Sequence, residues 1–159
     1  MAKRWYGSLQ NRLEENRQFV DEIKVGMGAT EYYYTDREPY EVIAVKDQKH
    51  ITVRKLDAKR IDSNGMSDCQ EYEYVSNENN YTVDLVKRGD YWYIATTITA
   101  EELEDIMAKR DNYTDVDIQA IMWASQFDHD KVREKGKQTK YHKMNISIGR
   151  AEKYYDYSF

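Results

Sequence analysis

Tyrosines lie close to basic residues at several places along this chain, and that combination is typical of nucleotide binding. Residues 32–37 join three tyrosines to Arg37, basic residues cluster at 54–60 and 140–143, and residues 150–155 mix both types. Aromatic faces stack on nucleobases, and Arg or Lys neutralises phosphate. The sequence therefore predicts that a small anionic, nucleotide-type ligand contacts Tyr32, Tyr34, Arg37, Arg54, Arg60, Arg150 and Tyr155.

A purely structural role for these tyrosines is also compatible with the pattern, and it is the more common role of tyrosine in strands. Tyrosine is a good strand former, and its hydroxyl can stay in water at the face of a sheet. Successive side chains of a strand point to opposite faces, so Tyr32, Tyr33 and Tyr34 cannot all share one face. Both interpretations stay open on the sequence alone.

Three further groups of residues suggest a chemical role, and each has a simpler structural explanation. The Asp-His-Asp run at 128–130 offers metal ligands, but no second cluster has metal-ligand spacing, so we expect a polar helix C-terminus. Cys69 lies in an expected strand without a catalytic signature, which favours a small core residue. The glycines at 26 and 28 lack the third glycine of a dinucleotide site and predict a turn. No catalytic residue, metal or cofactor is predicted.

Composition limits the class of protein. The 159 residues are 40% apolar and 33% charged, and 15 Tyr, 3 Trp and 3 Phe can supply the core of a single domain. One cysteine and no long apolar run favour a cytoplasmic protein with no membrane segment. The net charge is −5, although residues 131–143 are locally basic. Bulk nucleic-acid binding is not expected, because it needs a broad basic surface.

The periodicity predicts an α+β fold, with a small antiparallel curled sheet or SH3-like barrel, an N-terminal helix and an inserted helical hairpin. Within residues 1–24, Ser8–Ile23 has a helical apolar pattern that includes Leu9 and Leu13. Residues 25–98 form the β core, because short alternating runs are separated by turn signals. Strands are expected at 30–34, 40–45, 50–55, 69–75, 81–86 and 91–97.

The period changes at Thr99. The run Thr99–Glu102 is a capping box, and a second helix start follows at Thr114, so residues 99–128 predict a helical insertion. Residues 129–159 complete the single domain with three expected parts: a basic loop over Lys131–Lys140, a strand over Tyr141–Ile148 that returns to the sheet, and an aromatic tail.

Resemblance to a family is carried by three stretches, VGMGATEYYYTDREPYEVIAV, ITVRKLDAKRIDSNGMSDCQEYEYVSN and IGRAEKYYDYSF. They resemble a family of small, uncharacterised proteins encoded by bacteriophages and prophages of Gram-positive and gut bacteria. The resemblance spans roughly residues 25–98 and 145–159. It implies a phage origin and the cytoplasm of a bacterial host, and it carries over no catalytic residue.

Small phage accessory proteins often counter host defence. The leading hypothesis is therefore a protein that sequesters a nucleotide-type signal without chemistry, as a homo-oligomer whose intersubunit clefts would suit a small ligand. A second hypothesis is an inhibitor that binds a host effector protein directly, with acidic residues at 68–73 and 101–105 imitating nucleic acid. An enzyme that degrades a signalling nucleotide and a component of the virion are the third and fourth hypotheses.

Overall fold

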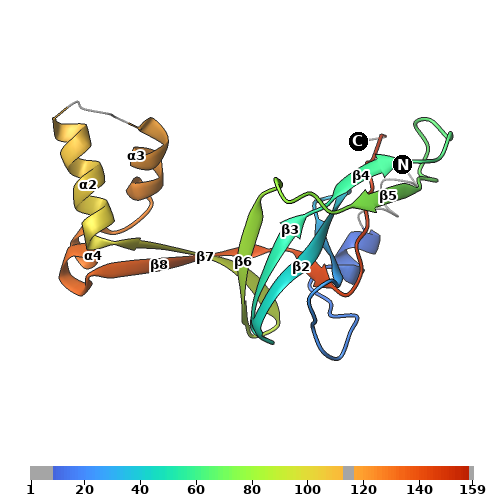
Figure 1. Ribbon diagram of the computed structural model, residues 1–159, viewed down its shortest axis with the longest axis horizontal. Coiled ribbons are helices and arrows are strands. Elements are labelled where there is room, and N and C mark those ends of the chain that lie inside the picture. The colour runs from blue at the N-terminus through green and yellow to red at the C-terminus, as the bar shows by residue number, and fades with distance from the viewer. Residues whose placement is uncertain (1–8, 113–116, 158–159) are drawn as a thin grey trace. The chain divides into compact units, whose positions relative to one another are not determined.

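The computed structural model describes residues 9–112 and 117–157. Its backbone contacts separate two compact units (Figure 1). The sheet unit comprises Met1–Ile94 and Lys143–Phe159, and the helical unit comprises Ala95–His142. The strands β7 and β8 each contribute residues to both units.

A seven-stranded curled antiparallel sheet has the order β8-β7-β6-β3-β2-β1-β9. Its strands, in chain order, are β1 Gly28–Tyr32, β2 Arg37–Asp47, β3 His50–Lys55, β6 Thr82–Arg88, β7 Tyr91–Thr99, β8 Lys137–Met144 and β9 Ile146–Ile148. Most of it follows from hairpins, as the turn signals predicted; β2 and β3, for example, meet where Asp47 pairs with His50. The prediction of an α+β fold with a small curled antiparallel sheet is confirmed.

The core of the sheet unit lies on one face of this sheet. Tyr40 and Val42 on β2 and Ile51 and Val53 on β3 are buried at every second position, as a half-buried strand requires. The cluster that they form is completed by Ile23, Ala29, Leu85, Trp92, Met144, Ile146 and Ile148.

A separate two-stranded ribbon pairs β4 (Asp57–Arg60) with β5 (Tyr72–Val75). The strand predicted at 69–75 begins only at Tyr72, and Cys69 is exposed, so the prediction of a core cysteine is wrong. The reason is Asp62, whose carboxylate accepts hydrogen bonds from the backbone N–H groups of Asn64 and Glu71 and shapes the intervening loop.

The N-terminal helix is shorter than predicted and turns its other face to the protein. Residues 9–14 are helical, whereas Leu9 and Leu13 are 53% and 59% exposed. Residues 17–19 instead run beside β9, because the Phe19 N–H donates to the Ile148 carbonyl and the Ile148 N–H to that of Arg17. This pairing gives hydrogen-bond partners to the backbone groups of β9 at the edge of the sheet. A longer helix would have left those groups unpaired. Ser8, at which the helical pattern was predicted to begin, lies outside the described residues.

The first half of the helical insertion matches its prediction. Thr99 caps α2 (Ala100–Asp111), because its hydroxyl accepts from the Glu102 N–H at 3.2 Å. The predicted second start at Thr114 lies outside the described residues, and α3 (Ile118–Ser125) is capped by Asp117. The apolar core of the helical unit comprises Ile98, Leu103, Met107, Ala124, Phe127 and Val132.

The second half corrects the prediction of a basic loop over Lys131–Lys140. Asp128 caps a further helix, α4 (His129–Lys135), so the acidic run at 128–130 begins a helix and does not end one. Gly136 ends α4 at a φ of 83°, and β8 starts at the next residue. The strand predicted over Tyr141–Ile148 is two strands, β8 and β9, separated at Asn145.

Among the described residues, no helix is both long and apolar enough to cross a lipid bilayer.

Candidate ligand-binding cavity

A polar cavity of about 450 Å³ lies within the sheet unit. It is lined by Gln10, Asn11, Glu14, Arg37, Asp68, Gln70, Tyr74, Arg150, Glu152, Lys153 and Tyr154. These residues come from the N-terminal helix, the start of β2, the loop before β5, β5 itself and the residues that follow β9, which we call the C-terminal segment. Three cations and three carboxylates therefore face one space.

The C-terminal segment is fixed to the sheet by backbone and hydroxyl contacts. Arg37 and Tyr154 exchange backbone hydrogen bonds of 2.9 and 3.1 Å. The Thr30 hydroxyl donates to the Arg150 carbonyl at 2.8 Å and accepts from the Glu152 N–H at 2.9 Å. The Tyr74 hydroxyl accepts from the Lys153 N–H at 2.8 Å. This anchoring sets the direction of the Arg150 and Glu152 side chains.

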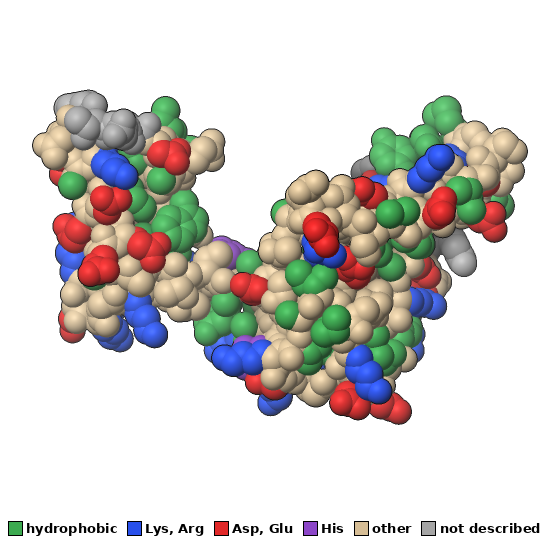
Figure 2. Space-filling view, in the orientation of Figure 1, with side chains coloured by type: hydrophobic (Ala, Val, Ile, Leu, Met, Phe, Trp, Pro, Cys, Tyr) green, Lys and Arg blue, Asp and Glu red, His purple; other side chains and the backbone are tan. Residues whose placement is uncertain are grey.

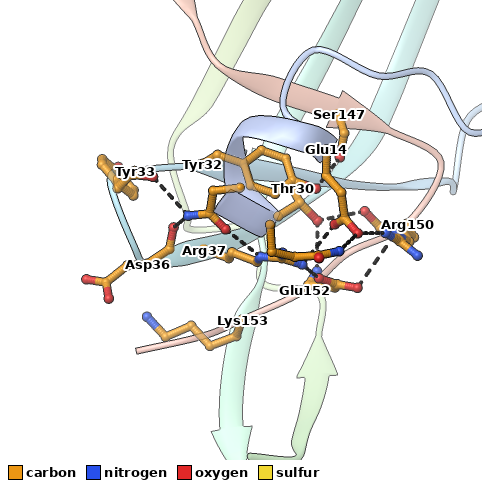
Figure 3. Close-up of polar contacts among 12 residues, drawn as sticks. Glu14, Thr30, Tyr32, Tyr33, Asp36, Arg37, Ser147, Arg150, Glu152 and Lys153 are labelled. Carbon is orange, nitrogen blue, oxygen red and sulfur yellow. Dashed lines mark hydrogen bonds and ion pairs between the residues drawn. The ribbon is translucent and has the colours of Figure 1, made fainter. Parts of the chain in front are cut away.

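Glu14, Arg37, Glu152 and Arg150 form a closed ring of alternating charges, which we call the ion-pair ring (Figure 3). Glu14 lies 3.0 Å from Arg37 Nη1 and 2.9 Å from Arg150 Nη2. Glu152 bonds the same Arg37 nitrogen and lies 3.6 Å from Arg150 Nε. The ring joins the N-terminal helix, β2 and the C-terminal segment.

Neighbouring groups orient the two arginines of the ring. Arg37 Nε donates to the Asn11 side-chain oxygen at 2.9 Å, and its guanidinium carbon lies 5.2 Å from the centre of the Tyr32 ring. Arg150 lies in the same way over Phe19, at 4.2 Å. A planar guanidinium can hold a carboxylate or phosphate through two N–H groups, so fixed orientation favours anion recognition.

The tyrosine hydroxyls of the cavity are held in their neutral form. Burial raises the pKa of Tyr154, and the hydrogen bond that its hydroxyl donates to Asp68 at 2.6 Å raises the pKa further. Burial also raises the pKa of Tyr74, against the lowering effect of the Lys153 N–H. A neutral phenol adds no full negative charge to the cavity, whereas a phenolate would repel an anion.

The structure brings three of the seven predicted contact residues together. Arg37 and Arg150 line the cavity, and Tyr32 lies beneath Arg37 with only 3% of its surface exposed and its hydroxyl 2.9 Å from that of Ser147. Tyr32 therefore supports Arg37 and offers no face to a ligand in this conformation.

The remaining four predicted contact residues lie away from the cavity lining. Arg54 bonds Glu41 at 2.7 Å, and Arg60 pairs with Asp62 and lies over Tyr157. Tyr34 and Tyr155 are exposed, at 58% and 49%. The arginines that were grouped by sequence thus separate into one cavity pair and two locally neutralised residues.

Sequence reasoning missed Glu14, Glu152 and Lys153 as cavity residues. The one local signal was a polar face, which Asn11 and Glu14 form at helical spacing on the side of the helix opposite the leucines. No signal pointed to Glu152, since its ring partner Arg37 is 115 positions away.

The histidines are placed outside this cavity. His50 contacts Asp47 at 2.8 Å in the hairpin turn, His129 contacts the Ala124 carbonyl, and His142 contacts Gln126. Across residues 9–112 and 117–157, no group of three or more His, Cys, Asp or Glu side chains is placed to hold a metal ion.

The ion pairs of Glu14 predict that the protein loses folding stability in acid. Burial alone would raise its pKa, but the charge of Arg37 and the hydrogen bond and charge of Arg150 outweigh burial and hold the pKa below its ordinary value of 4.5. A lowered folded-state pKa contributes stability above that ordinary value, and the contribution disappears as the pH falls through the folded-state pKa. We expect urea unfolding between neutral pH and about pH 3 to show this loss.

The matched variants are Glu14→Gln and Glu22→Gln, the latter at an exposed position. Glu14→Gln should be less stable than the parent at neutral pH, and its stability should fall less between about pH 4.5 and 3. Glu22→Gln should follow the parent. Parallel acid profiles for the parent and Glu14→Gln would show that the ring does not govern this dependence.

Comparison of the chain with protein-family models, with curated proteins and with solved structures gave no match. The chemistry of the cavity therefore rests on its own residues.

Proposed function

We propose that this chain is a non-catalytic binding protein whose cavity takes a small anionic ligand with an aromatic ring, such as a nucleotide. The observation that carries the proposal is the convergence of Arg37, Arg150 and Lys153 with Tyr74 and Tyr154 on one cavity. Its volume, about 450 Å³, falls in the range of small-molecule sites. The cations suit phosphate, and the phenol rings suit a base.

The internal charges of the cavity determine how an anion would enter. Arg37 and Arg150 are paired with Glu14 and Glu152. Lys153 is paired with Glu38. A bound anion therefore takes the place of a carboxylate. Glu152 is the one that leaves, because its side chain is 34% exposed whereas that of Glu14 is 10% exposed. Outward rotation of Glu152 frees Arg150 Nε and one side of Arg37, while Glu14 still pairs with both arginines and keeps the N-terminal helix in place.

In the setting that the phage resemblance implies, such a protein sequesters a nucleotide signal of host defence. The acidic residues that would serve a direct protein inhibitor are divided between the two units, with Glu71 and Glu73 exposed beside or on β5 and Glu101 and Asp105 exposed on α2. The cavity is lined by residues from more separate segments of the chain than either group of acidic residues comprises. We therefore favour binding of a small ligand over direct inhibition of a protein.

The first test is a thermal-shift screen with cyclic dinucleotides and trinucleotides, ADP-ribose and NAD, followed by mass spectrometry of the ligand. A ligand that binds the folded state raises the melting temperature by mass action. A rise with the ligand recovered intact supports the proposal. A rise with altered ligand mass makes the protein an enzyme, and no rise with any member of the panel overturns the proposal.

Two substitutions in the cavity should change affinity in opposite directions. Arg150→Gln should weaken binding about tenfold or more, because a charge-assisted hydrogen bond is lost. Glu152→Gln should tighten binding, since it removes the charge with which the ligand competes. Arg54→Gln is the matched control outside the cavity and should leave the dissociation constant unchanged in calorimetry. Weaker binding by Glu152→Gln, or equal losses from both arginine variants, would contradict this placement of the ligand.

A further inference from the structure

The helix α3 is apolar on nearly every side, yet the helical unit buries little of it. Its sequence is IQAIMWAS, with no charged residue, and Ala124 is its one buried residue. Ile118 and Met122 are 68% and 63% exposed. A helix that is hydrophobic all round is normally buried, whereas the described residues of the helical unit leave the outer face of α3 uncovered. Hydrophobic side chains show over α3 in Figure 2.

Ile118, Met122 and Ser125 form a stripe along α3, which we call the α3 stripe. Their spacing of four and then three residues places them on one face of a helix. The Ser125 hydroxyl donates to the Met122 carbonyl at 2.6 Å, so the hydroxyl hydrogen is already bonded inside the helix. A covering surface would therefore contact the large Ile118 at one end, Met122 at the centre and the small Ser125 at the other end. Covering Ser125 would not leave its hydroxyl donor without a hydrogen bond.

This stripe is complementary to itself. When two copies of α3 pack antiparallel about a two-fold axis near Met122, Ile118 of each copy lies opposite Ser125 of its partner. Large side chains then meet small ones at both ends, and the two Met122 side chains meet at the centre. Methionine adapts its shape to such a contact. An isologous interface requires this kind of pairing, in which a patch fits its own copy.

Charges beside the stripe also suit a second copy. A groove of about 170 Å³ between α2 and α3 is lined by Asp105, Lys109, Arg110 and Asp117, with Ile121 among its apolar residues. Within the chain Lys109 pairs with Asp105 and Arg110 pairs with Asp111, so the rim is close to neutral and does not repel a second copy. An exclusively acidic or basic partner would be repelled by half of the rim.

We propose that the α3 stripe is a homodimer interface that joins the helical units of two copies of this chain. Eight residues of helix are about 12 Å long, which gives less area than the roughly 800 Å² per partner of a stable complex. The dimer is therefore weak, and its population rises with protein concentration in the micromolar range and above. This inference is independent of the proposed ligand.

Sedimentation velocity of the full chain from about 1 μM to about 1 mM covers the range of weak association. The parent should shift from monomer toward dimer across this range. Met122→Asp should raise the dimer dissociation constant at least about tenfold, because a carboxylate would be buried at the centre of the interface. Leu13→Asp is the matched control, since Leu13 is 59% exposed on the sheet unit, and it should leave association unchanged.

A crosslink gives a positive test of the symmetry. In a Cys69→Ser background, Met122→Cys should form an intermolecular disulfide under mild oxidation, because the two copies of position 122 face each other. Leu13→Cys in the same background should not. Monomer at every concentration, or association that Met122→Asp does not weaken, overturns the proposal. Failure of the ligand screen leaves it unaffected.

Discussion

Arg37→Met should lower the unfolding free energy of the sheet unit by about 3–5 kcal/mol, the cost of removing one partner from a buried ion pair. The Arg37 side chain is 11% exposed and contacts Glu14, whose side chain is 10% exposed, as well as Glu152. Without the guanidinium, the Glu14 carboxylate keeps only Arg150 as a charged partner in the ring. The measurement is urea unfolding followed by tryptophan fluorescence at neutral pH, reporting through buried Trp92.

The control is Arg12→Met, at an exposed position in the N-terminal helix that also contains Glu14. It should change the unfolding free energy by no more than about 0.5 kcal/mol, as surface substitutions usually do. Adding Glu14→Gln to Arg37→Met should restore part of the loss, because no carboxylate is then left short of a partner. If Arg37→Met lowers the free energy of unfolding no more than Arg12→Met does, the ion-pair ring does not stabilise the fold.

The β-sheet could be predicted from the sequence because its information is local. The runs Tyr40–Val45 and His50–Lys55 alternate in polarity, and a short polar turn separates them. The local sequence of this hairpin therefore indicates which residues of its two strands pair. The capping box at Thr99 is equally local, since all its groups lie within four residues.

The N-terminal helix shows where periodicity alone fails. Leu9 and Leu13 have the spacing of a buried face, but the buried residues are Asn11 and Glu14. Burial of polar groups is favourable only when each finds a partner. Asn11 finds the Tyr33 carbonyl and Arg37, and these partners cannot be known before the strands are placed.

The helix α4 was missed although its local signals were present. Asp128 is a good N-cap, Gly136 a good C-terminal residue and Val132 an apolar anchor between them. The basic residues around Val132 favoured a solvated loop. In the structure Arg133 bonds Glu104 of α2 at 2.9 Å, a contact between helices that the local sequence does not reveal.

Two of the cations that line the cavity could be recognised in the sequence by residue type, whereas their neighbours could not. Arg37 and Arg150 were expected to contact a ligand, and both line the cavity. For Arg37 and Arg54, neutralisation depends on residues farther away in the chain, whereas Arg60 pairs locally with Asp62. Glu41 holds Arg54, and Glu152 holds Arg37 across 115 positions. Sequence patches therefore identified residue types, but not which of those residues share the cavity.

Gly28→Ala should disturb both the fold and the cavity, because there is no room for a side chain where β1 meets the C-terminal segment. A Cβ at this position would lie 2.5 Å from the Ala151 nitrogen and 2.9 Å from the Arg150 carbonyl carbon, both backbone atoms. Backbone cannot rotate away as a side-chain tip can, so we expect the segment to shift at a cost of about 1–3 kcal/mol.

The part of the chain in which hydrogen exchange rises would show whether the contact between position 28 and the C-terminal segment causes the loss of stability. Displacing residues 150–152 weakens the bonds from Thr30 to Arg150 and Glu152, so hydrogen exchange should rise in the C-terminal segment and ligand affinity should fall. Gly26→Ala is the control: Gly26 has a φ of 95° and open space around its Cβ position. It should cost about 1 kcal/mol of left-handed strain and leave C-terminal exchange unchanged. Equal exchange in both variants would mean that the contact with Ala151 does not explain why glycine occupies position 28.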